Sequence, residues 1–200
     1  MKSKTLTLLI FLFSSFTAAY SQIFKHSVGA TILVIGSKGQ IAQKDFLGMS
    51  YLKSYNFIME AVEVTYFPRL NFELGYNSSF SIGAPISIGI GAASDINKEN
   101  SGVYFSYSLP VMADLNLGLG AVEETEKRFG YFLGGGFGYG YVNLELTSGS
   151  SKISSYGPLA HGGVRFKIGN TGSITTGLFY KQGLETLKYK TFGIQVLADL

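Results

Sequence analysis

The stretch from Val103 to Gly120 alternates without a break between apolar residues and small or polar ones, and it constrains the fold more than any other segment. Successive side chains of a β-strand point to opposite faces, so one face of this segment is apolar and the other is not. Strands of globular proteins usually run about 3–10 residues. A strand that crosses a membrane takes about 9–11 residues and can continue beyond the lipid. The segment therefore predicts a membrane-crossing strand, with these residues on its apolar face: Val103, Phe105, Tyr107, Leu109, Val111, Ala113, Leu115, Leu117 and Leu119.

The same alternation recurs along the chain, and helical apolar periodicity does not appear after residue 21. We expect eight strands, at 24–36, 54–67, 79–92, 103–120, 130–144, 157–168, 172–182 and 190–200. Bacterial barrels have an even number of strands, short periplasmic turns and longer outer loops. The tight turn at 169–172 fits a periplasmic end, and the connections 37–53 and 145–156 fit an outer end. A break at Pro110 would instead give nine strands and would reverse the direction of every later one.

The non-apolar face indicates which kind of barrel forms. It is mostly glycine and serine, which suits the filled interior of a narrow barrel, whereas a soluble ligand-binding barrel turns its apolar face inward. Tyrosines stand near the strand ends on the apolar face, as in membrane barrels: Tyr66, Tyr107, Tyr131, Tyr141 and Tyr180. The sequence therefore predicts an all-β fold, an eight-stranded antiparallel up-and-down transmembrane β-barrel. A secreted soluble lipocalin-like ligand-binding barrel is the alternative.

Residues 1–21 have the composition of a secretory signal peptide. Lys2 and Lys4 precede an apolar run from Thr5 to Phe16, and Ala19-Tyr20-Ser21 fits the small-residue rule for cleavage. The run is shorter than the roughly 20 residues of a membrane-spanning helix. We expect cleavage after Ser21, one barrel domain over residues 22–200, and location in the bacterial outer membrane.

Charge and cysteine content exclude several classes of protein. The chain has 16 Lys and Arg against 13 Asp and Glu, and removal of Lys2 and Lys4 leaves 14 − 13 = +1, which gives no support for nucleic-acid binding. The absence of cysteine rules out disulfides and thiolate metal sites.

Four segments carry a resemblance to a known group of proteins: 66–69, 79–85, 109–116 and 134–138, which read YFPR, SFSIGAP, LPVMADLN and GGGFG. In them the chain resembles the small eight-stranded outer-membrane barrels of the OmpA/OmpX type, and more narrowly the outer-membrane β-barrel family of Bacteroidota. The resemblance implies contact with outer-membrane lipids and insertion by the barrel-assembly machinery, and it transfers no functional residue. The chain departs from the group at Leu200, where an aromatic residue is usual, although Leu200 keeps the outward parity.

Five charged residues have inward parity and are expected near the periplasmic ends of their strands: Glu63, Asp114, Arg165, Lys167 and Asp199. Charges inside a narrow barrel are costly unless they are paired, so we expect both signs to meet in a structural polar plug. Arg165 should then face Glu63 or Asp114. A proton or solute path is the alternative interpretation, but an eight-stranded interior is only wide enough for side chains.

The two histidines form no recognisable catalytic pattern. A barrel that hydrolyses acyl chains needs serine and histidine side by side on the lipid face, but His161 has inward parity and His26 and Ser27 point to opposite faces. Two distant histidines also give no metal site, and the glycine run 134–140 lacks the lysine and helix of a phosphate loop.

We predict no catalytic, cofactor-binding or metal-binding residue and no cofactor. The predicted function is non-enzymatic, either envelope-structural or a surface interaction through the outer loops with an unidentified partner; an outer-membrane acyl hydrolase is the enzymatic alternative.

The second strand departs from strict alternation. Reading back from Tyr66 places Glu60 outward, whereas reading forward from Tyr55 places Met59 outward and Glu60 inside. One extra residue in the strand reconciles the two, so we expect a β-bulge near Glu60-Ala61. An unbroken strand in which Glu60 points outward above the lipid is the alternative.

Overall fold

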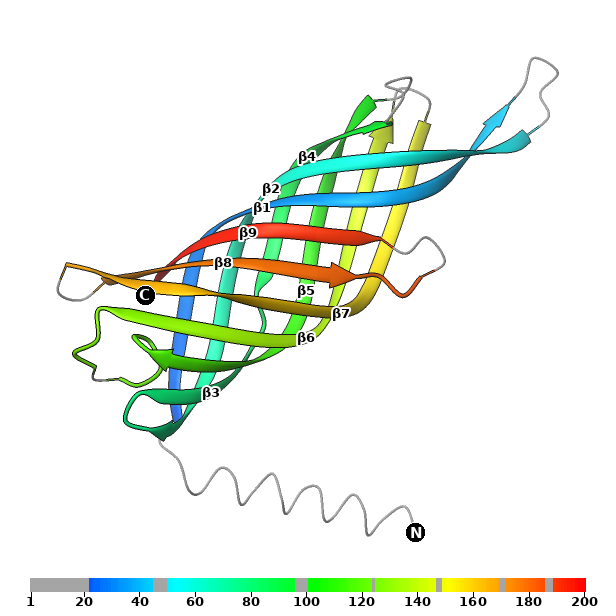
Figure 1. The fold of residues 1–200 in the computed structure, drawn as a ribbon. Helices are drawn as coiled ribbons and strands as arrows, with labels where there is room; N and C mark the ends of the chain where they lie inside the picture. The colour runs from blue at the N-terminus through cyan, green and yellow to red at the C-terminus, as the bar shows by residue number, and fades with distance from the viewer. Residues whose placement is uncertain are drawn as a thin grey trace, which may run out of the picture.

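The computed structural model describes residues 22–44, 50–95, 101–123, 125–146, 149–169, 172–185 and 189–200. The expected signal peptide lies outside these residues. Nine strands form one antiparallel sheet that closes into a barrel, because β1 (Gln22–Lys44) pairs with both β2 (Ser50–Gly75) and β9 (Lys190–Asp199) (Figure 1). The strands between them are β3 (Ser78–Gly83), β4 (Ile86–Asp95), β5 (Ser101–Gly118), β6 (Phe129–Leu146), β7 (Gly149–Ile168) and β8 (Gly172–Gln182). Across the described residues, no helix has the length and apolar character needed to cross a membrane.

β3 and β4 are two pieces of a single strand, so the wall of the barrel is a ring of eight strands, as predicted. Both pieces lie between β2 and β5, and the register against each neighbour is the same on both sides of the interruption. The interruption falls at Pro85, with Pro68 close by on β2, where neither residue has an N–H to donate. The alternative of a break at Pro110 is wrong, because β5 runs through it and Pro110 pairs with Gly138.

Several strands are longer than the sequence predicted. β1 and β2 pair continuously from Gln22 opposite Phe72 to Lys44 opposite Ser50, so most of the expected loop 37–53 is a hairpin, and only 45–49 lies outside the described residues. β6 and β7 likewise replace most of the expected loop 145–156. Antiparallel pairing satisfies the backbone N–H and C=O groups whatever the side chains are, so a hairpin continues where the apolar alternation has ended.

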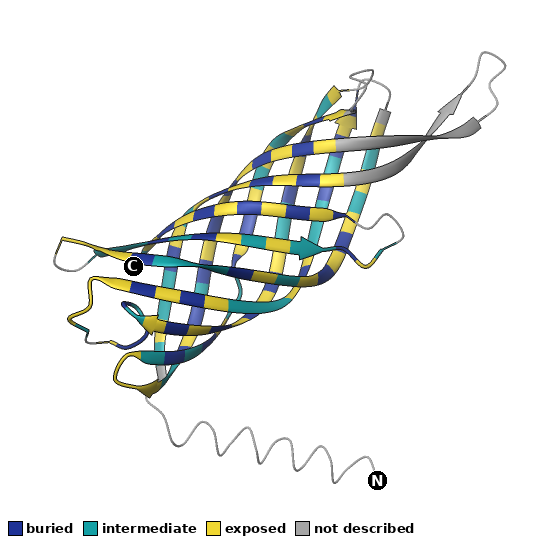
Figure 2. Ribbon diagram, viewed as in Figure 1, coloured by how far each residue is buried: buried dark blue, intermediate teal, exposed yellow. Residues whose placement is uncertain are grey.

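Burial alternates from residue to residue along the strands (Figure 2), and in β5 the outward face is the apolar one that the sequence predicted. The predicted outward position of Leu119 is wrong: β5 ends at Gly118, where the chain turns, and Leu119 is buried. The expected bulge in β2 is wrong. The register of β2 against β1 and β4 is unbroken through Glu60, which is exposed, while Met59 and Ala61 are buried. The irregularity in β2 lies instead between Glu73 and Gly75. The prediction failed because it assumed that an apolar residue such as Met59 must face outward.

The interior has two different halves. The half nearer to the two described chain ends holds these buried polar and charged residues: Ser27, Arg69, Asn71, Ser79, Ser81, Asp114, Asn116, Arg165 and Thr175. The opposite half holds an apolar cluster of Leu33, Ile35, Met59, Ala61, Ala93, Tyr104, Val142, Leu144, Leu146 and Tyr189. The sequence-based expectation of a uniformly small and polar interior therefore holds for one half only.

Candidate functional site

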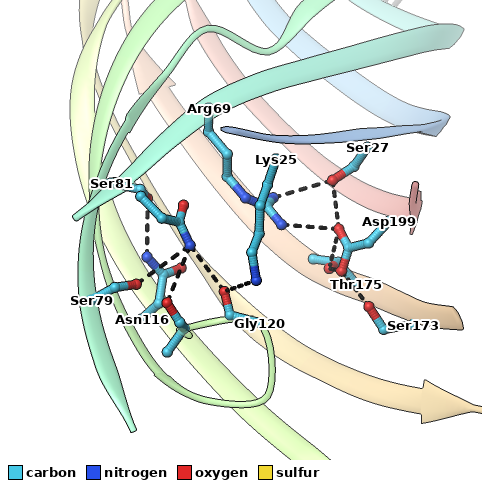
Figure 3. A network of polar contacts seen from close by, with 12 residues as sticks. Lys25, Ser27, Arg69, Ser79, Ser81, Asn116, Gly120, Ser173, Thr175 and Asp199 are labelled. Carbon is cyan, nitrogen blue, oxygen red and sulfur yellow. Dashed lines mark hydrogen bonds and ion pairs between the residues drawn. The ribbon is translucent and has the colours of Figure 1, made fainter. Parts of the chain in front are cut away.

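A polar network holds the end of the barrel nearer to the chain ends (Figure 3). Arg69 on β2 has a fully buried side chain; its Nη2 donates to Asp199 Oδ1 at 3.0 Å and its Nη1 donates to Ser27 Oγ at 3.2 Å. The Asp199 carboxylate also accepts hydrogen bonds from the hydroxyls of Ser27, Ser173 and Thr175. One arginine and one carboxylate thereby link β1, β2, β8 and β9 across the point where the barrel closes.

The turn after β5 folds over the same end of the interior. Asn71 Nδ2 donates to the Gly120 carbonyl oxygen at 3.0 Å, and Lys25 Nζ donates to the carbonyl oxygens of Gly120 and Val122 at 3.3 and 3.2 Å (Figure 3). Gly120 has a φ of +80°, which favours glycine. Ala121 and Val122 are buried. The turn therefore covers this mouth of the barrel with backbone and apolar side chains.

Two of the five charged residues expected in the polar plug lie inside the barrel with partners that the sequence analysis did not assign. Asp199 is paired with Arg69, and Asp114 Oδ1 lies 2.6 Å from His161 Nε2, with both side chains almost completely buried. The His161 ring also packs edge-on against Phe132, with ring centroids 5.0 Å apart. The alternation in the sequence indicates that the side chains of Asp114 and His161 both point inward. It does not indicate that they contact each other, because β6 lies between β5 and β7.

The other three charged residues lie apart from one another. Arg165 is buried with its guanidinium 5.0 Å from the centre of the Phe132 ring, and it forms no ion pair within 4 Å with Glu63 or Asp114, so that expected pairing is wrong. Glu63 is buried further along the barrel, where its Oε1 accepts a hydrogen bond from Ser106 Oγ at 2.7 Å. Lys167 is exposed, in contrast to the prediction, because the last residues of β7 run past the interior.

Arg69 and Lys181 are two charged residues of the interior that the sequence analysis missed, and Lys25 at the mouth of the barrel is a third. Arg69 continues the inward parity of Glu63 along β2, but the strand was expected to end at residue 67, before Pro68. Lys181 follows the inward-facing Gly177 and Phe179 on β8, yet it lies near a strand end, where an inward lysine is easily taken for a solvated one. Extending the alternation of inward and outward positions to the end of each strand identifies Arg69 and Lys181 as inward residues.

The serine and histidine residues considered for catalysis are not brought together. His26 packs against Phe24 and Tyr66, with ring centroids 5.7 and 6.1 Å away, while Ser27 is buried and bonded to Asp199. His161 is bonded to Asp114 inside the barrel. The described part of the chain contains no group of three or more histidine, aspartate or glutamate side chains that could bind a metal ion.

The outer wall of the barrel is apolar over its whole circumference. Each of the nine strands contributes large exposed hydrophobic side chains, among them Ile32, Val64, Ile82, Ile88, Val111, Leu133, Ile168, Leu178 and Ile194. Three tyrosines gather on the wall over β5 and β6: the rings of Tyr107 and Tyr141 stack at 5.2 Å, and Tyr107 lies 6.1 Å from Tyr139. Soluble monomers rarely expose a contiguous apolar patch of more than a few hundred Å². The wall is therefore that of a transmembrane barrel, in which lipid covers the apolar side chains.

No family model and no curated protein sequence matches this chain. Three solved structures similar to it are Neisserial surface protein A, Ail of Yersinia pestis, and the outer membrane protein OprG of Pseudomonas aeruginosa. Their identities to this chain are 14%, 12% and 7%, and their TM-scores are 0.49, 0.43 and 0.44. The alignments cover 90%, 88% and 88% of this chain and 98%, 99% and 94% of the respective structures. At these identities and TM-scores, no residue or activity of these proteins is transferred to the present chain.

Proposed function

We propose that this protein is a non-enzymatic β-barrel of the bacterial outer membrane, with an envelope-structural or surface-interaction role. The observation that carries the proposal is the apolar wall around a closed ring of strands. Even the shortest uninterrupted strand of the ring, β9 with 10 residues, is long enough for a tilted crossing of the lipid, which takes about 9–11 residues. Closure leaves no unpaired sheet edge within the lipid, which a membrane-spanning sheet requires.

A pore is disfavoured by the filled half of the interior. The network of Arg69 and Asp199 and the turn from Gly120 to Val122 occupy the end nearer to the chain ends. In the orientation that the exported N-terminus implies, this end faces the periplasm. The barrel then acts as a fixed element of the membrane whose opposite end is available at the cell surface.

The enzymatic alternative has no support in the arrangement of the side chains. An acyl hydrolase of the lipid face needs a serine nucleophile within hydrogen-bond distance of a histidine base. His26 lies on the outer face next to aromatic rings, and the neighbouring Ser27 points inward to Asp199. The soluble-barrel alternative requires the apolar face of the strands to point inward, but those residues are exposed on the wall.

The proposed surroundings follow from the same wall. Outer-membrane lipids cover it, and the barrel-assembly machinery inserts it. A surface partner would contact the end at which β1 and β2 project as a long hairpin (Figure 1).

Cell fractionation combined with a conductance measurement tests the proposal. The full-length gene expressed in a Gram-negative host should give a product in the outer-membrane fraction that migrates differently in detergent gels before and after heating. The purified barrel should add no conductance to a planar bilayer and should release no fatty acid from phospholipid vesicles. Recovery in the soluble fraction after verified export contradicts the membrane assignment; a stable single-channel current contradicts the closed interior; and acyl release contradicts the non-enzymatic role.

A further inference from the structure

The half of the barrel farther from the described chain ends encloses a cavity of about 90 Å³ that is not fully closed off. Its apolar lining comes from the strands around the barrel and includes Leu33, Met59, Val142, Ile153 and Phe179. An engineered apolar cavity of about 150 Å³ holds a benzene ring, so a partly open cavity of this size is suited to a short alkyl chain. The polar network in the other half of the barrel closes the cavity on that side.

Hydrogen-bond donors face this cavity without a partner. Lys181 on β8 lines it, and its Nζ lies 2.9 Å from the position that a Cβ on Gly140 would occupy, so the ammonium reaches across β7 to β6. Among the described residues, Lys181 makes no hydrogen bond and no ion pair within 4 Å. Ser155 and Gln195 also line the cavity, and both are more than nine-tenths buried. Ser155 Oγ and Gln195 Nε2 have no hydrogen-bond partner in the part of the chain that the structure describes.

Gly140 creates the room for the lysine head. It is the residue opposite Ser155 in the pairing of β6 with β7, and the Ser155 carbonyl oxygen lies 3.9 Å from the same Cβ position. The ammonium of Lys181 and the backbone of Ser155 are therefore neighbours on the cavity wall. Lys181 is half-buried, and an ammonium that is partly removed from water beside apolar side chains is stabilised when an acceptor meets it.

We propose that this cavity of about 90 Å³ binds a short-chain fatty carboxylate, of roughly four carbons on the comparison of volumes above, with its carboxylate at Lys181 and its alkyl chain against the apolar lining. Glu63 is the opposite charge in the lining. Its Oε1 accepts a hydrogen bond from Ser106 Oγ at 2.7 Å, whereas the ammonium of Lys181 has no hydrogen-bond partner among the described residues, so the site favours a carboxylate over a cationic amphiphile. Binding at this site is separate from the membrane role proposed above.

The methionines of the chain provide a direct probe. There are four, and two of them, Met59 and Met112, line the cavity. The barrel carrying ¹³C-methyl methionine is refolded into nanodiscs of zwitterionic lipid and titrated with butyrate, 1-butanol and butylamine. Folding is checked independently by the heat-dependent gel shift, so a failure to form the barrel is not confused with a failure to bind. The Met59 and Met112 signals are assigned with Met59→Leu and Met112→Leu.

Butyrate should shift both methyl signals saturably at about millimolar concentration, as expected for a ligand of about six non-hydrogen atoms. Lys181→Gln should weaken butyrate binding about tenfold or more, because a hydrogen bond to a charged group is lost, and should leave 1-butanol unaffected. The matched control Lys152→Gln changes an exposed lysine on β7 and should bind butyrate like the unaltered protein.

Three results overturn the proposal: no saturable shift of Met59 or Met112 with butyrate, equal binding of butyrate by Lys181→Gln and the unaltered barrel, or tighter binding of butylamine. If Lys181→Gln does not fold, the comparison of ligands on the unaltered barrel still tests the proposal. Binding of 1-butanol as tight as that of butyrate would then show that the carboxylate has no partner in the cavity and would refute the assignment.

Discussion

Arg69 should contribute more to the stability of the barrel than any charged residue on its surface. The replacement Arg69→Met keeps much of the volume of the side chain but removes its charge and its donors. The structure shows what is lost: the ion pair with Asp199 at 3.0 Å, the hydrogen bond to Ser27 at 3.2 Å, and the position of the guanidinium 5.3 Å from the centre of the Phe67 ring. The Arg69 side chain is 0% exposed and that of Asp199 is 16% exposed. Water can therefore replace few of the interactions that Asp199 and Ser27 lose in the variant.

The magnitude follows from these contacts. Loss of a hydrogen bond between charged groups costs about 1.5–3 kcal/mol, and a desolvated cation–π contact contributes about 1 kcal/mol. Stranding a fully buried charge costs about 3–5 kcal/mol. Asp199 keeps the hydroxyls of Ser27, Ser173 and Thr175 as donors, which lowers the cost to the bottom of that range. We expect Arg69→Met to reduce the free energy of unfolding by about 3 kcal/mol.

Urea unfolding of the barrel in lipid vesicles, followed by far-UV circular dichroism and by gel mobility, measures this loss. The control is Arg128→Met, which removes an exposed arginine between β5 and β6 and should leave the urea midpoint unchanged. A double-mutant cycle with Asp199→Asn should give a coupling free energy of about 1.5–3 kcal/mol. A coupling below about 0.5 kcal/mol, within the additivity of independent sites, would refute the view that this pair holds the closure of the barrel.

Three further predictions concern the wall and the interior. Gly29→Ala should lower the free energy of unfolding by about 1–3 kcal/mol, because a Cβ there collides with the backbone of β9, whereas Gly36→Ala on the same strand, with its nearest neighbour 4.0 Å away, should leave the urea midpoint unchanged. Cysteine substitution and spin labelling at positions 58–64 should show lipid contact at every even position, and a change of phase at Glu60 would contradict the unbroken register. His161→Phe should cost about 3 kcal/mol by leaving the buried Asp114 carboxylate unpaired, and adding Asp114→Leu should restore most of it; a single variant as stable as the unaltered barrel would count against the pair.

The outer wall could be derived from the sequence, residue by residue. In the segment 103–117 and in the last strand, each outward position must meet lipid whatever its neighbours are, so its apolar character is a local requirement that the sequence displays directly. The number of strands in the ring and the outward position of Leu200 followed from the same rule. Strand ends could not be derived in this way, because the backbone pairing of β1 with β2 continues to Lys44 and Ser50, beyond the apolar alternation.

The interior was decided by the tertiary structure. Parity placed Asp114, Arg165 and Asp199 inside, but which charges meet depends on the tilt and register of strands far apart in the chain: Arg69 and Asp199 are 130 residues apart. Parity also failed at Met59, since an inward apolar residue at one end of the barrel looks like an outward one in the sequence. Each outward side chain must be compatible with lipid, independently of the other residues. Each inward side chain must be compatible with the residues that the closed barrel places opposite to it, and these are known only from the tertiary structure.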